Sequence, residues 1–296
     1  MPFLHLLLAL AVAAAWAFNF VAIKVGLAEL PPIFMAAMRF VLTALPAVFF
    51  IRPPKAPVGR VLMYGLFAFA GQFGFLFASM AAGMPPALAA LTLQLQVFVT
   101  IALAALLYRE RVGPVQLLGA AVAAGGIGLI AANTGGDVTV AGLLLGLTAA
   151  CCWGIGNMVG KSLGKVDMLA LVVWASLAVP LPLMALSLLL EGPQRIVDGL
   201  HHVSMIGALS VAYIAYASTL LAYTGWTWLM ARHPASTVAP FTLLVPPLAG
   251  LFSALTLHET FPGWKLAGGA LVLAGVVINL AGPRLLAGLR AARAGA

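Results

Sequence analysis

Residues 104–114 read AALLYRERVGP and residues 253–263 read SALTLHETFPG, so the two segments align without a gap at an offset of 149. Each ends an apolar run and places a glutamate, Glu110 or Glu259, in the turn that follows. Arg109 and Arg111 of the first copy correspond to a histidine and a threonine in the second. Because Lys and Arg are enriched in the cytoplasmic loops of membrane proteins, the two segments predict a duplication whose second copy is inverted in a membrane.

The duplication extends along most of the chain. At the same offset Tyr64, Pro85, Gly119 and Gly126 match Tyr213, Pro234, Gly268 and Gly275. Nearer the N-terminus, Trp16 and Lys24 match Trp153 and Lys161 at an offset of 137. The difference between the offsets predicts a twelve-residue insertion in the second copy, around residues 191–202. Internal repeats of this kind are typical of transporters.

The composition is that of a chain surrounded by lipid. Hydrophobic residues make up 64% and charged residues 7%, against about 45–50% and about 25% in soluble domains. The net charge of +8 comes from 15 Lys and Arg dispersed between apolar runs, which favours membrane orientation over nucleic-acid binding. Cys151 and Cys152 are adjacent within an apolar run and are interpreted as packing residues, since a vicinal disulfide is strained.

Ten apolar runs are long enough to cross a hydrocarbon core, which takes roughly 20 residues per helix. They lie near residues 4–24, 33–51, 61–82, 86–108, 115–132, 140–160, 169–190, 205–231, 235–257 and 264–280. Five helices per copy is an odd number, so the second copy must be inverted. We therefore expect an all-α membrane protein of ten transmembrane helices in two inverted five-helix repeats, residues 1–134 and 138–283, with a basic cytoplasmic tail at 284–296.

The distribution of positive charge agrees with this topology. With the N-terminus inside, the cytoplasmic segments contain Arg52, Lys55, Arg60, Arg109, Arg111, Lys161, Lys165, Arg232, Arg284, Arg290 and Arg293. The outer segments contain Lys24, Arg195 and Lys265. This bias predicts a multi-pass protein of a bacterial inner membrane with both termini cytoplasmic.

Several elements together resemble the EamA family of the drug/metabolite transporter superfamily. They are the five-plus-five helices, a Trp near the middle of helices one and six, Arg39-Phe40 in helix two, Pro234-Ala235 at the start of helix nine, and a glutamate after helices four and nine. The resemblance covers about residues 4–280. It implies export of amino acids and related metabolites through a cavity between the repeats, and within the family the chain is most similar to exporters of aromatic and of many amino acids.

Polar side chains inside the apolar runs are candidates for the substrate path, because they are costly in lipid unless partnered or hydrated. Their spacing puts each of three sets on one helix face: Thr92, Gln96 and Thr100; Tyr216, Thr219, Tyr223 and Trp226; Gln72 and Ser79. Such faces can hydrogen-bond a zwitterion and stack on its side chain. The alternative is hydrogen bonding between packed helices.

Helices one and six each carry a Trp and an Asn near their middle. Trp at mid-depth is unlike the interfacial aromatic belt, so we expect these side chains to line the cavity, with buried packing as the alternative. Arg39 is the charged residue well inside a span, where it meets a substrate carboxylate, bridges backbone carbonyls or snorkels outward. The predicted substrate site contains Trp16, Asn19, Arg39, Gln72, Gln96, Trp153, Asn157, Tyr223 and Trp226. It has no catalytic group, metal or cofactor.

Other residues are given structural interpretations. Lys24 and Lys161, at equivalent ends of the two repeats, are expected to snorkel, and Glu110 and Glu259 to cap or tie their own turns. Prolines at 180 and 182, and at 240, 246 and 247, predict interrupted helices seven and nine. The Gly- and Ala-rich helices five and ten are expected to form a packing scaffold.

An alternating-access exporter of small metabolites fits these patterns best. An intramembrane enzyme would need clustered acids, a metal set or a nucleophile with its base, yet Asp137, Asp167 and Asp198 fall in loops. A channel or receptor is less easily excluded from sequence, but the internal inversion gives a reason for two interconvertible states, which a passive pore does not need. Every carboxylate falls at a span end or in a loop, so facilitated export is preferred to the alternative, proton-coupled efflux. The expected partners are a small-molecule substrate and the lipid bilayer, without nucleic acid.

Overall fold

The computed structural model describes residues 1–135 and 138–294, with the backbone alone at residues 235, 236 and 283–294. Asp137, predicted to lie in a loop, is outside the described residues. Within them nine helical segments are long and apolar enough to cross a membrane, and Pro32–Val48 is a shorter apolar helix of 17 residues. At 1.5 Å per residue it covers about 26 Å of a core about 30 Å thick. The helical membrane fold is confirmed, and the count of ten spans stays a prediction.

The two halves of the chain carry equivalent elements. The first half has α1 (Phe3–Gly26), α2 (Pro32–Val48), α3 (Val58–Gly65), η1 (Leu66–Gly71), α4 (Gln72–Ala81), α5 (Pro86–Leu93), α6 (Gln96–Tyr108) and α7 (Pro114–Ala132). The second has α8 (Val140–Ser162), α9 (Met168–Ser176), α10 (Pro180–Leu190), α11 (Pro193–His202), α12 (Met205–Ala212), η2 (Tyr213–Leu221), α13 (Ala222–Arg232), α14 (Ala235–Val238), η3 (Ala239–Leu244), α15 (Val245–Leu257) and α16 (Gly263–Ala294). The additional helix, α11, occupies the predicted insertion.

Both halves have the same irregularities at the offset of 149. The third helix of each half contains a π-helical segment, η1 or η2. The fourth helix of the first half is interrupted at residues 94–95, and its equivalent contains the 3₁₀ segment η3. The prolines predicted the interruptions of helices seven and nine, but no proline marks the π segments or the α5–α6 break.

Helices α7 and α16 cross at four glycines that reveal the symmetry of the repeats. A Cβ added to Gly119 would lie 2.6 Å from the Gly275 carbonyl oxygen, and one added to Gly126 would lie 2.7 Å from that of Gly268. Gly268 and Gly275 are the equivalents of Gly119 and Gly126, so a two-fold rotation exchanges the two contacts, as in an isologous interface. The two helices are therefore antiparallel, the repeats are inverted, and the predicted packing scaffold is confirmed.

The first helix of each half packs mainly in the other half. Helix α1 lies against α12, η2, α13 and α15, whereas α8 lies against η1, α4, α5 and α6. We call α1 with residues 205–259 the α1 group, and α8 with residues 58–110 the α8 group. Gly156 allows the close approach in the α8 group, because a Cβ there would lie 2.6 Å from the Ala68 Cβ. Residues between the two groups therefore come from both halves of the sequence.

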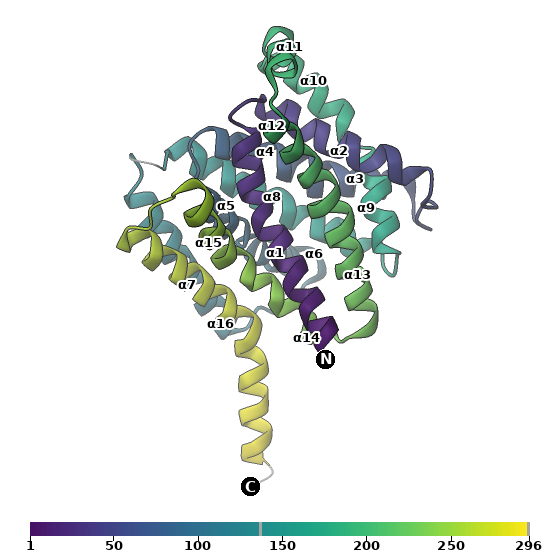
Figure 1. The fold of residues 1–296 in the computed structure, drawn as a ribbon. Coiled ribbons are helices and arrows are strands. Elements are labelled where there is room, and N and C mark those ends of the chain that lie inside the picture. The colour runs from purple at the N-terminus through teal and green to yellow at the C-terminus, as the bar shows by residue number, and fades with distance from the viewer. Residues whose placement is uncertain (136–137, 295–296) are drawn as a thin grey trace.

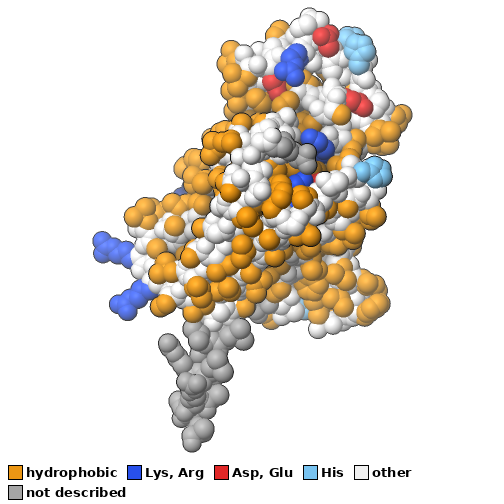
Figure 2. All heavy atoms as spheres, turned by 90° about the vertical axis from the view of Figure 1, so that its left-hand side faces the viewer, with side chains coloured by type: hydrophobic (Ala, Val, Ile, Leu, Met, Phe, Trp, Pro, Cys, Tyr) orange, Lys and Arg blue, Asp and Glu red, His pale blue; other side chains and the backbone are white. Residues whose placement is uncertain are grey.

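The molecule has two distinct ends (Figure 1). Both chain termini lie at one end, which we call the terminal face, and α11 lies at the opposite end, the α11 face. Apolar side chains cover most of the middle of the surface in Figure 2, while charged side chains gather towards the α11 face and at the edges. Large apolar side chains such as Leu181 and Leu189 are each 81% exposed. An apolar surface this extensive fits lipid rather than water.

Candidate functional site

Arg39 is the centre of a buried polar network in the middle of the bundle. Its side chain is 2% exposed. Nε and Nη2 donate to Thr219 Oγ1 at 3.2 and 2.9 Å, and Nη1 donates to Asn19 Oδ1 at 3.2 Å. The guanidinium carbon lies 4.0 Å from the centroid of the Phe73 ring. We call Asn19, Arg39 and Thr219 the Arg39 network; it joins α1, α2 and η2.

This geometry decides between the interpretations of Arg39 that the sequence left open. The guanidinium neither bridges backbone carbonyls nor snorkels, because its hydrogen bonds go to two neutral side chains. No carboxylate in the described part of the chain forms an ion pair with it. A buried cation held only by neutral groups retains a strong attraction for an anion.

The π-helical segment η2 accepts hydrogen bonds from three side chains. Trp16 Nε1 donates to the Ser218 carbonyl at 3.0 Å, Thr43 Oγ1 to Ala215 at 3.2 Å and Thr219 Oγ1 to Ile214 at 2.8 Å. The change from an α to a π pattern disturbs the regular ladder and frees carbonyls for such donors. Ser218 Oγ is also buried and has no hydrogen-bond partner among the described residues.

Thr43 and Ser218 were missed by the sequence reasoning. Thr43 lies four residues after Arg39 and therefore on the same helix face, a spacing that was available in the sequence. Ser218 had no comparable signal, because its position depends on the π turn.

Three predicted residues form an aromatic cluster next to the Arg39 network. The Trp16 ring centroid lies 5.4 Å from that of Tyr223 and 5.1 Å from that of Trp226. All three side chains are half-buried, and they come from α1 and α13. Edge-on and tilted rings at these distances form a stable apolar wall that keeps some ring faces available for stacking.

Gln96, Thr100 and Asn157 form an amide cluster between α6 and α8. Asn157 Nδ2 donates to Gln96 Oε1 at 2.6 Å and to Thr100 Oγ1 at 3.1 Å. These side chains are half-buried. Gln96 and Asn157, predicted site residues from different halves of the chain, are therefore in contact. Thr92, predicted to share their helix face, is fully buried and lies on the other side of the α5–α6 break.

The remaining predicted residues lie apart from these clusters. Trp153 is half-buried and packs against the main core. Gln72 is 5% exposed at the start of α4, and among the described residues no hydrogen bond joins it to either polar cluster. Ser79 follows the packing alternative, since Oγ donates to the Gly142 carbonyl of α8. Tyr216 is 39% exposed whereas Thr219 is 1% exposed, because the wider π turn changes the face that regular helical spacing predicts.

The two groups are packed more closely towards the α11 face than towards the terminal face. All eight residues of α5 are buried, and α5 packs against α15 and α1. In α6, on the terminal side of the same span, Ala104 is the buried residue, and the described residues of η3 include none. The amide cluster is therefore closed off on the α11 side and less covered on the terminal side.

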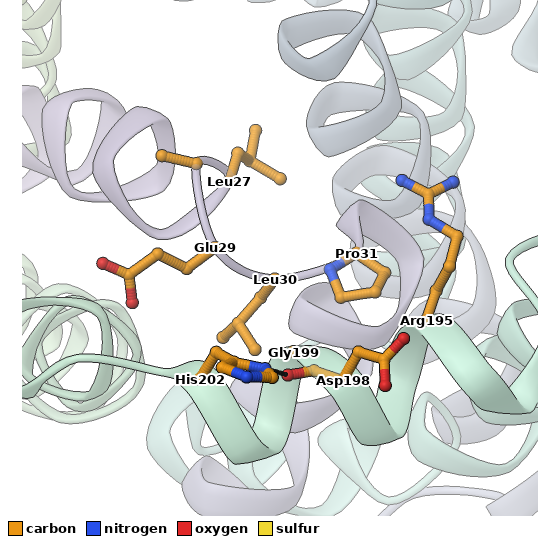
Figure 3. A pocket seen from close by; sticks show the side chains of 9 residues that line it. Leu27, Glu29, Leu30, Pro31, Arg195, Asp198, Gly199 and His202 are labelled. Carbon is orange, nitrogen blue, oxygen red and sulfur yellow. Dashed lines mark hydrogen bonds between the residues drawn. The ribbon is translucent and has the colours of Figure 1, made fainter.

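A separate pocket of about 440 Å³ lies at the α11 face, between the α1–α2 turn and α11 (Figure 3). Glu29 in its wall accepts hydrogen bonds from the Ser204 N–H and Oγ, both at 2.7 Å, and these bonds lower the pKa of its carboxyl. Asp198 Oδ1 accepts from Gln194 Nε2 at 2.9 Å. No predicted site residue lines this pocket, and both of these carboxylates accept hydrogen bonds from the protein itself.

Two structural interpretations need correction, and one contact of the insertion was not foreseen. Glu110 does not tie its own turn, because it forms an ion pair with Lys161 of α8. Lys161 does not simply snorkel, since it makes that pair and lies 4.7 Å from the Tyr108 ring centroid. Glu191, placed in the insertion, accepts hydrogen bonds from the N–H groups of Ile33 and Phe34 at 2.8 and 3.0 Å and so caps α2. Glu259 behaves as expected, for it accepts from Ser253 Oγ and lies 3.6 Å from Lys265.

Together these clusters contain one buried cation, three amide side chains and several ring faces within the apolar helices. Such groups bind carboxylate and amino groups and stack on side chains, and they carry out no bond-breaking chemistry by themselves. Within the described residues no three His, Cys, Asp or Glu are grouped so that they could hold a metal ion.

Comparison with known proteins finds one matching family and similar proteins in other bacteria. The EamA-like transporter family model matches residues 3–132 and 140–281. A Salmonella typhimurium protein named "Probable amino-acid metabolite efflux pump" is 42% identical over 284 residues, covering 94% of this chain and 95% of that protein. A protein of the same name from Escherichia coli K12 is 38% identical over 283 residues, covering the same shares.

A solved crystal structure with 20% identity has a TM-score of 0.63 and covers 97% of this chain and 99% of its own, which shows the same fold. The family and these relatives are membrane transporters, so the chain is a transporter and not an enzyme. The resemblance read from the sequence is confirmed: the chain belongs to the EamA-like transporter family.

Proposed function

We propose that this protein exports amino acids and related small metabolites across a bacterial inner membrane by alternating access, with broad specificity. The observation that carries the proposal is the meeting of the Arg39 network and the aromatic cluster between α1, α2, η2 and α13. It supplies a cation for a carboxylate beside ring faces for a side chain. The names of the two bacterial relatives support the same substrate class.

Each predicted residue has a role in this proposal. Arg39 and Asn19 bind the substrate carboxylate, and Trp16, Tyr223 and Trp226 contact its side chain. Gln96, Asn157, Gln72 and Trp153 line the opposite wall. Apolar contacts discriminate by only about 1–3 kcal/mol per methylene, so amino acids of several sizes share the site.

The proposed cycle uses no proton. Among the described residues every Asp and Glu lies outside the candidate membrane spans, although Asp198, predicted to be in a loop, is in helix α11. Proton-exchanging carriers, by contrast, place ionisable groups within the membrane. Export then follows the metabolite gradient. Reconstituted protein should show counterflow without a pH gradient, and a strict requirement for one would favour proton-coupled efflux instead.

The substrate class is tested with purified protein in proteoliposomes and a panel of radiolabelled amino acids. Uptake should saturate with concentration and accept several amino acids. A variant with Trp16, Gln96, Trp153 and Tyr223 all replaced by alanine should insert normally and lose most of this uptake. Saturable uptake at the wild-type rate in that variant would show that the path lies elsewhere, and uptake that never saturates would indicate a pore.

We further propose that the terminal face is cytoplasmic, with repeats at 1–134 and 138–283 and the basic tail at 284–296 inside. Glu110 and Glu259 lie in equivalent turns on opposite faces, which makes them matched positions for labelling. In intact cells an impermeant maleimide should modify a cysteine at 259 and leave one at 110 unmodified, in a background without Cys151 and Cys152. Modification at 110 alone would reverse the topology.

A further inference from the structure

The two equivalent lysines have different kinds of partner. Lys161 forms an ion pair with Glu110 at the terminal face, and both residues belong to the α8 group. Lys24 Nζ, at the α11 face, donates to the Met80 carbonyl at 3.5 Å. Met80 lies in the last turn of α4, so this hydrogen bond crosses from the α1 group to the α8 group. It lies on the face where the groups are packed closely.

The glutamate equivalent to Glu110 does not contact Lys24. Glu259 accepts a hydrogen bond from Ser253 at Oε2, while Oε1 lies 3.6 Å from Lys265 Nζ. The Glu259 side chain is 9% exposed, and Oε1 is buried with no hydrogen-bond partner among the described residues. Glu259 Oε1 can therefore still accept a hydrogen bond. Glu259 occupies the position in the α1 group that Glu110, the partner of Lys161, occupies in the α8 group.

The repeat symmetry identifies the partner that each lysine would have in the opposite state. The position equivalent to Met80 is Leu229, which lies in the last turn of α13 at the terminal face. A carbonyl in the last turn of a helix attracts a cation through the helix dipole. By symmetry, closing the terminal face would bring the Leu229 carbonyl within hydrogen-bonding reach of Lys161, just as the Met80 carbonyl accepts from Lys24 in this structure.

We propose that Lys24 and Lys161 exchange partners as the carrier changes the face to which it is open. On the closed face the lysine donates across the groups to a helix carbonyl, and on the open face it pairs with the glutamate of its own group. This structure represents the state closed at the α11 face. In the opposite state Lys24 pairs with Glu259, and Lys161 donates to the Leu229 carbonyl.

The exchange gives both states the same number of lysine contacts. Two conformations can be populated together only when their free energies are close, and equivalent contacts that alternate between faces keep them so. Lysine suits this role because its ammonium is a compact charge on a flexible four-carbon stem. The inference rests on the proposed alternating access.

The test uses glutamine at each glutamate. Glu110→Gln removes the ion pair with Lys161, which exists in the present state only. Glu259→Gln removes the pair with Lys24, which exists in the opposite state only. It also removes the contact of Glu259 with Lys265, but that contact lies within one turn and is lost equally from both states, so it does not change their balance. The variants should therefore shift the equilibrium in opposite directions, each by about two- to fivefold, as expected for partly exposed ion pairs. Arg111→Gln, which removes a charge beside Glu110, is the matched control and should cause no shift.

The readout is the maleimide labelling rate of two equivalent reporters, Leu103→Cys in α6 and Phe252→Cys in α15, in a background without Cys151 and Cys152. Glu110→Gln should slow labelling at 103 and accelerate it at 252, and Glu259→Gln should do the reverse. The double variant Lys161→Glu with Glu110→Lys keeps the pair but has no donor for the Leu229 carbonyl. Its labelling at 103 should be at least as fast as in the wild type, which tests the proposal independently of Glu259.

The outcomes separate this inference from the proposed function. If an added transported amino acid changes the two wild-type rates in opposite directions but the glutamine variants do not, alternating access stands and the lysine exchange is wrong. If the two wild-type rates never change in opposite directions, alternating access itself is wrong and the exchange falls with it.

Discussion

Replacing Arg39 with methionine is expected to reduce amino acid transport by about 10- to 150-fold while the protein remains folded. A hydrogen bond to a charged group contributes about 1.5–3 kcal/mol, and tenfold corresponds to about 1.4 kcal/mol. Folding should tolerate the change, because no carboxylate among the described residues is left unpaired and methionine fills similar space; the cost is the lost donor to Asn19 and Thr219, about 1–3 kcal/mol. The measurement is initial uptake in proteoliposomes together with the unfolding temperature in detergent.

The choice of substrate separates recognition from a general structural defect. Transport of amino acid amides, which lack the carboxylate, should change much less than transport of the parent amino acids. Arg39→Lys should recover only part of the activity, because an ammonium cannot reproduce the fork that reaches Thr219 and Asn19 together. An equal loss for acids and amides, or a large drop in unfolding temperature, would mean that Arg39 acts by holding α1, α2 and η2 in place.

A second large effect is expected at Gly126. Its Cβ would lie 2.7 Å from the Gly268 carbonyl oxygen and 2.9 Å from the Val272 backbone nitrogen, so leucine must force α7 and α16 apart. Overpacking costs about 1–3 kcal/mol where side chains can adjust, and backbone atoms cannot. Gly126→Leu should therefore destabilise by about 3 kcal/mol or more and lower the unfolding temperature by about 6–12 °C.

Gly125 is the matched control for this prediction. It is the adjacent residue of the same helix, it is exposed, and a Cβ there meets nothing within 4 Å. Gly125→Leu should leave expression, unfolding temperature and transport near their wild-type values. Similar behaviour of the two variants would show that the α7–α16 crossing is not a tightly packed scaffold.

The duplication preserves the backbone but not the chemistry of the site. The positions equivalent to Asn19, Arg39 and Thr219 are the small residues Gly156, Ser176 and Ala70. The Arg39 network therefore has no polar counterpart at these positions, and Gly156 of α8 instead packs closely against Ala68. If the Arg39 network binds substrate as proposed, recognition is asymmetric within a symmetric scaffold.

The sequence by itself determined the membrane class, the inverted repeat and most of the polar candidates. These follow from properties that are local along the chain: apolar runs set by bilayer thickness, charge at the turns and helical spacing of side chains. The glycines at 119, 126, 268 and 275 indicated the scaffold in the same way, since only small residues allow close helix contact.

Only the tertiary structure decided which candidates meet. The pairing of Arg39 with Thr219 depends on α2 packing against η2, and that of Asn157 with Gln96 on α8 packing against α6. Both contacts join the two halves of the chain, which no local pattern encodes. The π segments η1 and η2 change the helix face that spacing predicts, and no proline or glycine rule marks where they begin. Contacts such as Glu110 with Lys161 join residues far apart in sequence, so they follow from the way whole helices pack rather than from the residues near each position.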